Sequence, residues 1–167
     1  AQMSLRLAAE MVHLGGGAPD LPTAEQRVRE ALLSGRGLQV LRAFVALHGG
    51  EASMVDDPSR LPQAPEHLDL CAEAPGRVAA LASRELGLVA MELGAGRRSQ
   101  ADRIDPAVGL EVLVKVGEAV APGTPLLRLH GRSREALLAQ VDRARRAFTL
   151  RGDMTEVAHS WLLEELA

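Results

Sequence analysis

Residues 92–129 contain the strongest fold signal in the chain. They begin with the end of an apolar helical pattern and pass into a glycine-rich polar loop over residues 94–105. Residues 110–116 then alternate apolar and mostly polar side chains, which is typical of a half-buried strand. Turn signals rich in glycine and proline precede a second apolar run at 126–130. This order predicts a helix end, a loop and a tight β-hairpin.

The composition is that of a globular protein with an aliphatic core. Hydrophobic residues make up 47% of the 167 residues and aromatic residues only 2%, so leucine, valine and alanine must fill the core. The formal net charge of −3 is too close to neutral to indicate a nucleic-acid partner. The single cysteine, Cys71, cannot form an internal disulfide and indicates a reducing compartment, which we take to be the cytoplasm.

The sequence gives no sign of a membrane partner. No apolar run is long enough to span a bilayer, and no basic segment followed by an apolar one marks a signal peptide. The chain does not open with methionine, and its first residues already have a helical pattern. We therefore expect it to begin inside a larger protein.

The first 60 residues predict three short amphipathic helices. Their apolar periodicity predicts helix ends at Gly15, Gly35 and Gly49. The second helix is expected to begin at a capping box formed by Thr23 and Gln26. Three helices of this length cannot bury their apolar faces without a further layer. Either they pack on the C-terminal half, or their partner lies outside this chain.

A proline-rich stretch over residues 56–65 is expected to be an extended connector. The domain boundary is placed there, between residues 1–60 and 61–167. Beyond it, residues 68–73 and 77–81 are predicted to be strands.

Two further helices and a final strand complete the expected C-terminal part. Ser83 is predicted to cap a helix that ends at Gly94, and Ser133 a helix that continues to Phe148. Residues 156–166 are predicted to form an edge strand.

The loop at 94–105 is the best candidate for a functional segment. Gly94 and Gly96 would let the backbone approach a ligand, and Arg97 can hold an oxyanion with a fixed fork of donors. Dinucleotide-binding glycines lie between a strand and the start of a helix, whereas these follow a helix end. A helix cap followed by a surface loop is the simpler interpretation, and a mobile loop that closes over a ligand is the alternative.

The residues form no complete catalytic or metal-binding set. The five histidines are isolated and make no pair with ligand spacing. The glycines from Gly15 on lack the Gly-Lys-Ser/Thr ending of a phosphate loop. Asp102 and Asp105 are weak as a cation site, because two carboxylates on one loop are too few. We therefore assign no catalytic residue and no metal ligand.

Two resemblances meet in the stretch described first. Residues 114–127, with 74–78 upstream, resemble the hairpin and first strand of biotinyl and lipoyl carrier domains, which implies a small barrel-like sandwich. Such carriers hold their cofactor on a lysine at an exposed hairpin tip. Lys115 is the only lysine and falls inside the predicted strand, so we reject the carrier function and keep the β architecture.

The second resemblance is longer, and it is to the C-terminal part of thymidine and pyrimidine-nucleoside phosphorylases. The Leu-Gly-Ala-Gly-Arg run at 93–97, followed by Ile-Asp-Pro-Ala-Val-Gly at 104–109, is its most specific part. The other segments that match are the helix at 5–14 and the runs at 34–38, 44–50, 55–58, 61–64, 74–78 and 115–120. The resemblance covers nearly the whole chain and fades after about residue 150.

The resemblance implies a pentosyltransferase that converts thymidine or uridine and phosphate into the free base and a 1-phosphosugar. It implies no organic cofactor, phosphate as co-substrate, a homodimer and, in some members, a structural potassium ion. The implied fold is α+β. Residues 1–60 would be the helical end of the central α/β domain, and residues 61–167 a C-terminal domain in which a barrel- or sandwich-like β structure carries helices.

The sequence departs from the family pattern in one respect. The Lys-His-Ser-Thr-Gly-Gly phosphate motif and the base-holding Ser-Lys-Lys element are absent from it, and both belong to the family's earlier two-thirds. No catalytic residue is therefore carried over. We expect a chain that is inactive alone, has the remainder of a phosphorylase as its partner and contributes to domain closure.

Two alternatives stay open at this point. One is a stand-alone interaction or ligand-binding module, which a stable monomer would favour. The other is a piece of a nucleoside-monophosphate phosphorylase. Aggregation through the helices at 5–12 and 38–45 would instead favour the phosphorylase fragment.

Overall fold

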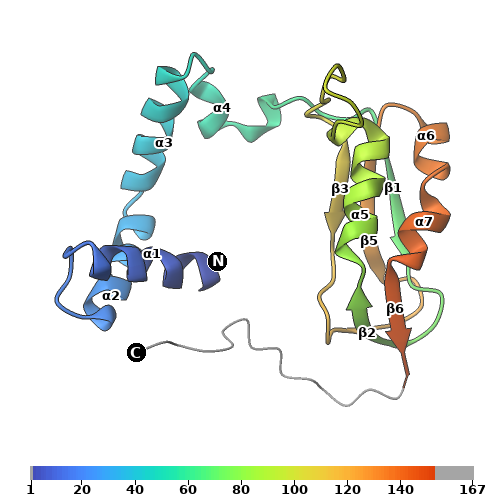
Figure 1. Ribbon diagram of the computed structural model, residues 1–167, viewed down its shortest axis with the longest axis horizontal. Helices are drawn as coiled ribbons and strands as arrows, with labels where there is room; N and C mark the ends of the chain where they lie inside the picture. The colour runs from blue at the N-terminus through green and yellow to red at the C-terminus, as the bar shows by residue number, and fades with distance from the viewer. Residues whose placement is uncertain (1, 153–167) are drawn as a thin grey trace. The chain divides into compact units, whose positions relative to one another are not determined.

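The computed structural model describes residues 2–152, and the chain divides into two compact units, Ala1–Arg60 and Leu61–Ala167 (Figure 1). The first unit is helical, whereas the second combines helices with two small antiparallel sheets. The expected α+β class is therefore confirmed. No helix within residues 2–152 is long and apolar enough to cross a bilayer.

The first unit contains α1 (Gln2–Leu14), α2 (Leu21–Leu33), α3 (Arg36–Leu47), the short α4 (Ser53–Asp56) and the single turn η1 (Pro58–Arg60). Its core is small, because the buried residues are three alanines on and beside α1 and α2: Ala9, Ala18 and Ala24. Val12, Leu21 and Val28 pack around them and remain partly exposed.

The three main helices end near the expected glycines, but two local predictions for this unit are wrong. The N-cap of α2 is Asp20, whose Oδ1 accepts a hydrogen bond from the Thr23 N–H at 2.8 Å. Aspartate caps a helix at least as well as threonine and Pro22 suits the first turn, so the helix starts before the predicted Thr23 capping box. The connector at 56–65 is also not extended throughout, because it includes η1.

The second unit contains two three-stranded antiparallel sheets. In the first, β5 (Pro125–Gly131) lies between β1 (Glu66–Cys71) and β3 (Gly109–Val112). In the second, β2 (Gly76–Leu81) lies between β4 (Ala119–Val120) and β6 (Phe148–Arg151). The described strands form no closed barrel.

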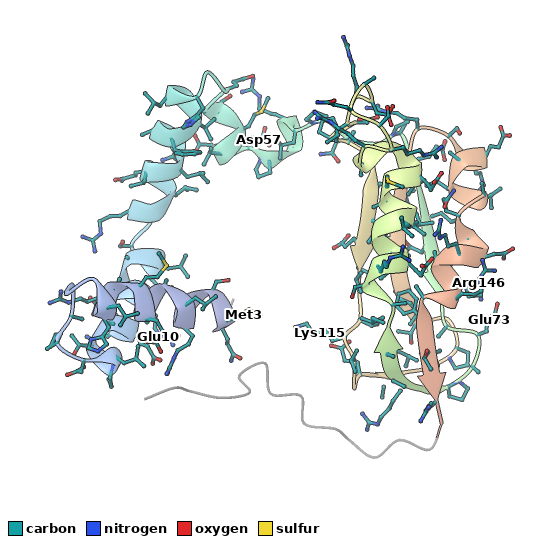
Figure 2. The ribbon with its side chains drawn as sticks, in the orientation of Figure 1. Met3, Glu10, Asp57, Glu73, Lys115 and Arg146 are labelled. Carbon is teal, nitrogen blue, oxygen red and sulfur yellow. The ribbon has the colours of Figure 1, made fainter. Side chains whose placement is uncertain are left out.

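The predicted tight hairpin is wrong. The strands β3 and β5 do pair, with Glu111 opposite Arg128, but the residues between them cross to the second sheet, where β4 pairs with β2. The strand ends at Val112, and Lys115 lies on the connection (Figure 2). The segment is drawn away because Val114 and Val120 are buried in a second hydrophobic cluster.

The helices of this unit cover the first sheet. The helix α5 (Ser83–Ala90) continues as a π-helical segment, η2 (Met91–Ala95), and packs against β3 and α7 (Figure 1). The short α6 (Arg134–Leu138) packs on β1 and β5, and α7 (Val141–Arg146) leads into β6. The fully buried residues of this layer are Val89, Leu127, Leu129, Leu137 and Ala144.

The helix caps in this unit follow the sequence only in part. Ser133 is the N-cap of α6 as predicted, and its Oγ accepts from the Ala136 N–H at 3.2 Å. The single helix expected from Ser133 is two short helices, and Phe148 begins β6 instead of ending a helix. Ser83 is the first residue of α5 and not its cap, which is Ala82. The strand predicted at 156–166 lies outside the described residues.

Candidate functional site

The candidate loop begins where the helix α5–η2 ends. Gly94 has φ of 109°, a conformation that L side chains rarely adopt, and it breaks the helical path. Eleven positions later the Asp105 N–H donates to the Gly94 carbonyl oxygen at 2.9 Å. The two ends of the loop at 94–105 are therefore tied to each other, and the sequence expectation of a helix end at Gly94 is confirmed.

The carboxylate of Asp105 ties the loop to the sheet as well. It accepts from Arg132 Nε at 2.5 Å and from Arg132 Nη2 at 2.7 Å, and Oδ1 also accepts from the Ala107 N–H at 3.0 Å. The hydrogen bonds from Arg132 are the main reason why the pKa of Asp105 is below its ordinary value, and they raise the pKa of Arg132. Because Arg132 directly follows β5, this ion pair joins the loop to the central strand of the first sheet.

A second aspartate shapes the middle of the loop. Asp102 accepts from the Ser99 Oγ–H at 2.7 Å and from the N–H groups of Arg98 and Ser99 at 2.9 and 3.0 Å. These hydrogen bonds lower the pKa of Asp102, and the one from the Ser99 side chain has the largest effect. Arg98 in turn pairs with Glu92 at the end of the helix.

These bonds occupy both carboxylates that had suggested a weak cation site. Asp102 is held by its own loop and Asp105 by Arg132. Within residues 2–152, no group of three or more histidine, cysteine, aspartate or glutamate side chains is placed to hold a metal ion.

Arg97 and Arg103 differ from the other charged residues of the loop. Both are exposed, and no hydrogen bond or ion pair engages either of them within the part of the chain that the structure describes. Gly96 lies beside Met91, where an added Cβ would come within 3.2 Å of that side chain, so the loop is packed tightly against the helix at this point. The arrangement is a loop with fixed ends that presents two guanidinium groups to solvent.

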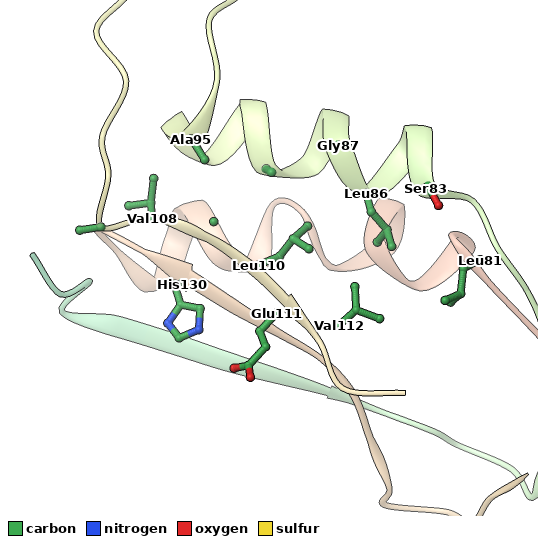
Figure 3. A pocket seen from close by; sticks show the side chains of 13 residues that line it. Leu81, Ser83, Leu86, Gly87, Ala95, Val108, Leu110, Glu111, Val112 and His130 are labelled. Atoms are coloured by element: carbon green, nitrogen blue, oxygen red, sulfur yellow. The ribbon is translucent and has the colours of Figure 1, made fainter. Parts of the chain in front are cut away.

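The base of the loop borders an open groove of about 620 Å³ between α5 and β3 (Figure 3). Its walls are mostly small or aliphatic, and its polar side chains are Ser83, Glu111 and His130. The apolar and glycine residues that line it are Leu81, Leu86, Gly87, Ala90, Ala95, Ala107, Val108, Gly109, Leu110 and Val112. Sequence reasoning missed this groove, because its walls come from segments that are separated along the chain.

A polar patch on the first sheet was also missed. Arg128 donates from Nε and Nη2 to Asp69 at 2.7 and 2.9 Å, and Glu111 lies opposite Arg128 on the other side. His67 and His130 are direct cross-strand partners, although each is isolated in sequence. Alternation within β1 and β5 was the available signal, but it identifies such neighbours only once the register is known.

The second unit belongs to the class of phosphorylase C-terminal domains, as a match to a known family shows. The family described as "Pyrimidine nucleoside phosphorylase C-terminal domain" matches residues 77–151, a range that includes the whole loop, both sheets in part and the groove. The match confirms the resemblance that the sequence suggested.

The curated relatives agree with this assignment. The pyrimidine-nucleoside phosphorylases of Bacillus subtilis (strain 168) and Geobacillus stearothermophilus are each 40% identical over 129 residues, and that of Staphylococcus aureus (strain USA300) is 37% identical. These matches cover 77% of this chain and 30% of each relative, so the chain spans less than a third of their length. The chain belongs to the pyrimidine-nucleoside phosphorylase family and carries its C-terminal domain.

Proposed function

We propose that this chain acts as the C-terminal portion of a pyrimidine-nucleoside phosphorylase and that its loop at 94–105 takes part in closing the substrate cleft. The observation that carries the proposal is the 40% identity to relatives of that name, over a segment that must include the loop at 94–105. The chain would supply one wall of the cleft and would be inactive alone, because the phosphate motif of the family is not in its sequence.

The proposed reaction places clear demands on the protein. Phosphate attacks the anomeric carbon of the nucleoside, the bond to the base breaks, and a 1-phosphosugar and the free base are released. Positive charge develops on the sugar ring and negative charge on the departing base, and preorganised donors must stabilise the negative charge on the base and the phosphate. Arg97 and Arg103 are the cationic groups that the loop could offer to such a cleft, since neither is engaged within residues 2–152.

The bonds that join Asp105 to Gly94 and to Arg132, called the brace from here on, suit a loop that moves as a lid. Asp105 holds both ends through Gly94 and Arg132, while Arg97 and Arg103 between them have no hydrogen-bond or ion-pair partner within residues 2–152. Loops of this kind order around a ligand and exclude water. The fixed ends would limit the motion to the residues that carry the arginines.

Several finer features come with this proposal. Phosphate would be the co-substrate, with no organic cofactor, and the intact cytoplasmic enzyme would be a homodimer. Any structural potassium ion would be held by the part of the phosphorylase that the match does not cover. The two sheets would form the barrel-sandwich expected of the C-terminal domain.

One observation favours a stand-alone module instead. The second unit buries a core of its own around Leu127, Leu129 and Leu137, so it has the means to fold independently. The first unit does not share this property, because only alanines are fully enclosed there. We therefore prefer the phosphorylase.

The test is a graft. The matched segment of the Bacillus subtilis enzyme is replaced by this chain, and phosphate-dependent release of uracil or thymine is measured from uridine and thymidine. Release of base supports the proposal. A soluble, folded graft that releases no base contradicts it.

A further inference from the structure

The helix α3 is apolar, and the rest of the first unit leaves it uncovered. It has 12 residues, and none of them is buried in the structure. Val40, Phe44 and Leu47 are 68%, 57% and 84% exposed, and their spacing places them on one stripe of the helix. Leu38 and Leu41 extend the apolar arc at 43% and 46% exposure. A helix that is apolar over most of its circumference is normally enclosed by other parts of a protein.

The helix α1 repeats the pattern. Met3, Leu7, Met11 and Leu14 share one face by their spacing and are 52% to 82% exposed. The opposite face of this helix carries Ala9, which is fully buried against α2. The face at 5–12 that the sequence suggested as uncovered is therefore partly packed, and the bare stripe lies on the other side.

Exposure on this scale is unfavourable. Covering a large aliphatic side chain contributes roughly 1.5–3 kcal/mol, and contiguous apolar surface on a monomer usually marks an interaction site. The charged residue near the middle of α3, Arg42, is turned to Asp56 of α4 and away from the stripe. The stripe on α3 is thus free of charge and open to an apolar partner.

The comparisons indicate what that partner is. A continuous match of 129 residues in a chain of 167 must begin at or before residue 39, so Val40, Phe44 and Leu47 lie inside it. The same match accounts for only 30% of the relative. Most of a phosphorylase therefore lies outside the matched segment and is available to cover these side chains.

We infer that the stripe formed by Val40, Phe44 and Leu47 on α3, together with the exposed face of α1, is the surface on which the remaining part of the phosphorylase docks. The occupant is an apolar face of that larger part, and not a second copy of this chain. The inference rests on the proposed function and adds the residues through which the two parts join.

The experiment is a co-expression test with a defined probe. The probe is the Bacillus subtilis pyrimidine-nucleoside phosphorylase without the matched segment, expressed together with the tagged full chain. The readout is the amount of soluble probe that co-purifies with the tag. The variants are Val40→Glu and Leu47→Glu, and the matched control is Gln39→Glu, which adds the same charge to an exposed polar position of the same helix.

The expected result is retention of the probe by the wild-type chain and by Gln39→Glu. Val40→Glu and Leu47→Glu should each reduce retention about tenfold or more, because they place an unpaired charge in an apolar interface. The isolated variants should keep the circular-dichroism spectrum and melting temperature of the wild type, since both positions are exposed in this chain.

Three outcomes would overturn the inference. The first is equal retention by all four proteins, and the second is no retention by the wild type. The third is self-association of the isolated chain that Leu47→Glu abolishes, because it identifies a second copy as the occupant. A complex that depends on the stripe but releases no base would leave the docking surface standing and refute the proposed function.

Discussion

Arg132 and Asp105 form a two-pronged ion pair that fixes the C-terminal end of the loop at 94–105 to β5, with N–O distances of 2.5 and 2.7 Å. The Asp105 backbone at the same time closes the loop onto Gly94. One residue therefore joins the loop to itself and to the sheet. This arrangement leaves Arg97 and Arg103 on a segment with fixed ends.

Replacing Arg132 with glutamine should loosen the loop without unfolding the domain. The side chain is more than half exposed, so its ion pair stabilises local order more than global stability. Trypsin cleavage after Arg97 and Arg103 should become faster by about fivefold or less, which is the range expected for an exposed pair. Arg134→Gln is the matched control, because Arg134 makes no ion pair or hydrogen bond within residues 2–152. Equal cleavage rates in the two variants would refute the brace.

The brace should also depend on pH in one direction. The pKa of Asp105 is lowered in the folded chain, chiefly by Arg132, so its contribution is complete above the ordinary aspartate pKa of about 3.9 and is lost as the pH falls through the lowered folded value. Urea unfolding of the wild type and of Asp105→Asn should therefore differ at pH 6 and converge towards pH 3. A difference that persists or grows at pH 3 would contradict this assignment.

Replacing either of two glycines in the same helical segment with alanine should change the stability of the fold, but in opposite directions. Gly94→Ala puts a side chain at φ of 109° and should cost about 1–3 kcal/mol, although its Cβ would meet Val108 only at an ordinary 3.5 Å. Gly87→Ala lies inside α5 with nothing within 4 Å of the new Cβ, and should stabilise the helix by about 0.5–1 kcal/mol. Thermal melts of both variants test the prediction, which fails if Gly94→Ala is neutral.

Gly131 and Leu137 should be energetically coupled. A Cβ on Gly131 would lie 2.7 Å from Leu137 Cδ2, so Gly131→Ala should cost about 1–3 kcal/mol through overpacking. Leu137→Ala, at a fully buried position, should cost about 2–5 kcal/mol through the cavity it leaves. The double variant should be less destabilised than the two single losses together, by about 0.5–3 kcal/mol in urea unfolding. Simple additivity would show that the two sites do not touch.

Local signals in the sequence predicted local features well. Gly94 ends a helix and Ser133 caps one, because a left-handed glycine and a side-chain oxygen act within a few residues of themselves. The same kind of signal misplaced the start of α2, where the sequence pointed to a capping box at Thr23 and the structure has Asp20 as the cap.

Long-range features could not be read in this way. The residues between β3 and β5 contain turn signals that favour a hairpin, but the burial of Val114 and Val120 in another cluster takes them to the second sheet. The brace was missed for the same reason, since Asp105 and Arg132 are 27 positions apart and nothing in either segment specifies the other. The loop itself was found from its glycines and arginines, whereas its fixed ends were not.

The most direct test of the account is the kinetics of Arg97→Ala in the grafted Bacillus subtilis enzyme. If the braced loop takes part in phosphorolysis, kcat/KM for uridine should fall by about tenfold or more, as expected when a cationic group near developing charge is removed. The melting temperature should not change, because Arg97 is exposed and unengaged within residues 2–152, and Arg134→Ala should leave the kinetics unaltered. An Arg97→Ala enzyme with the kcat/KM of its parent would contradict the account.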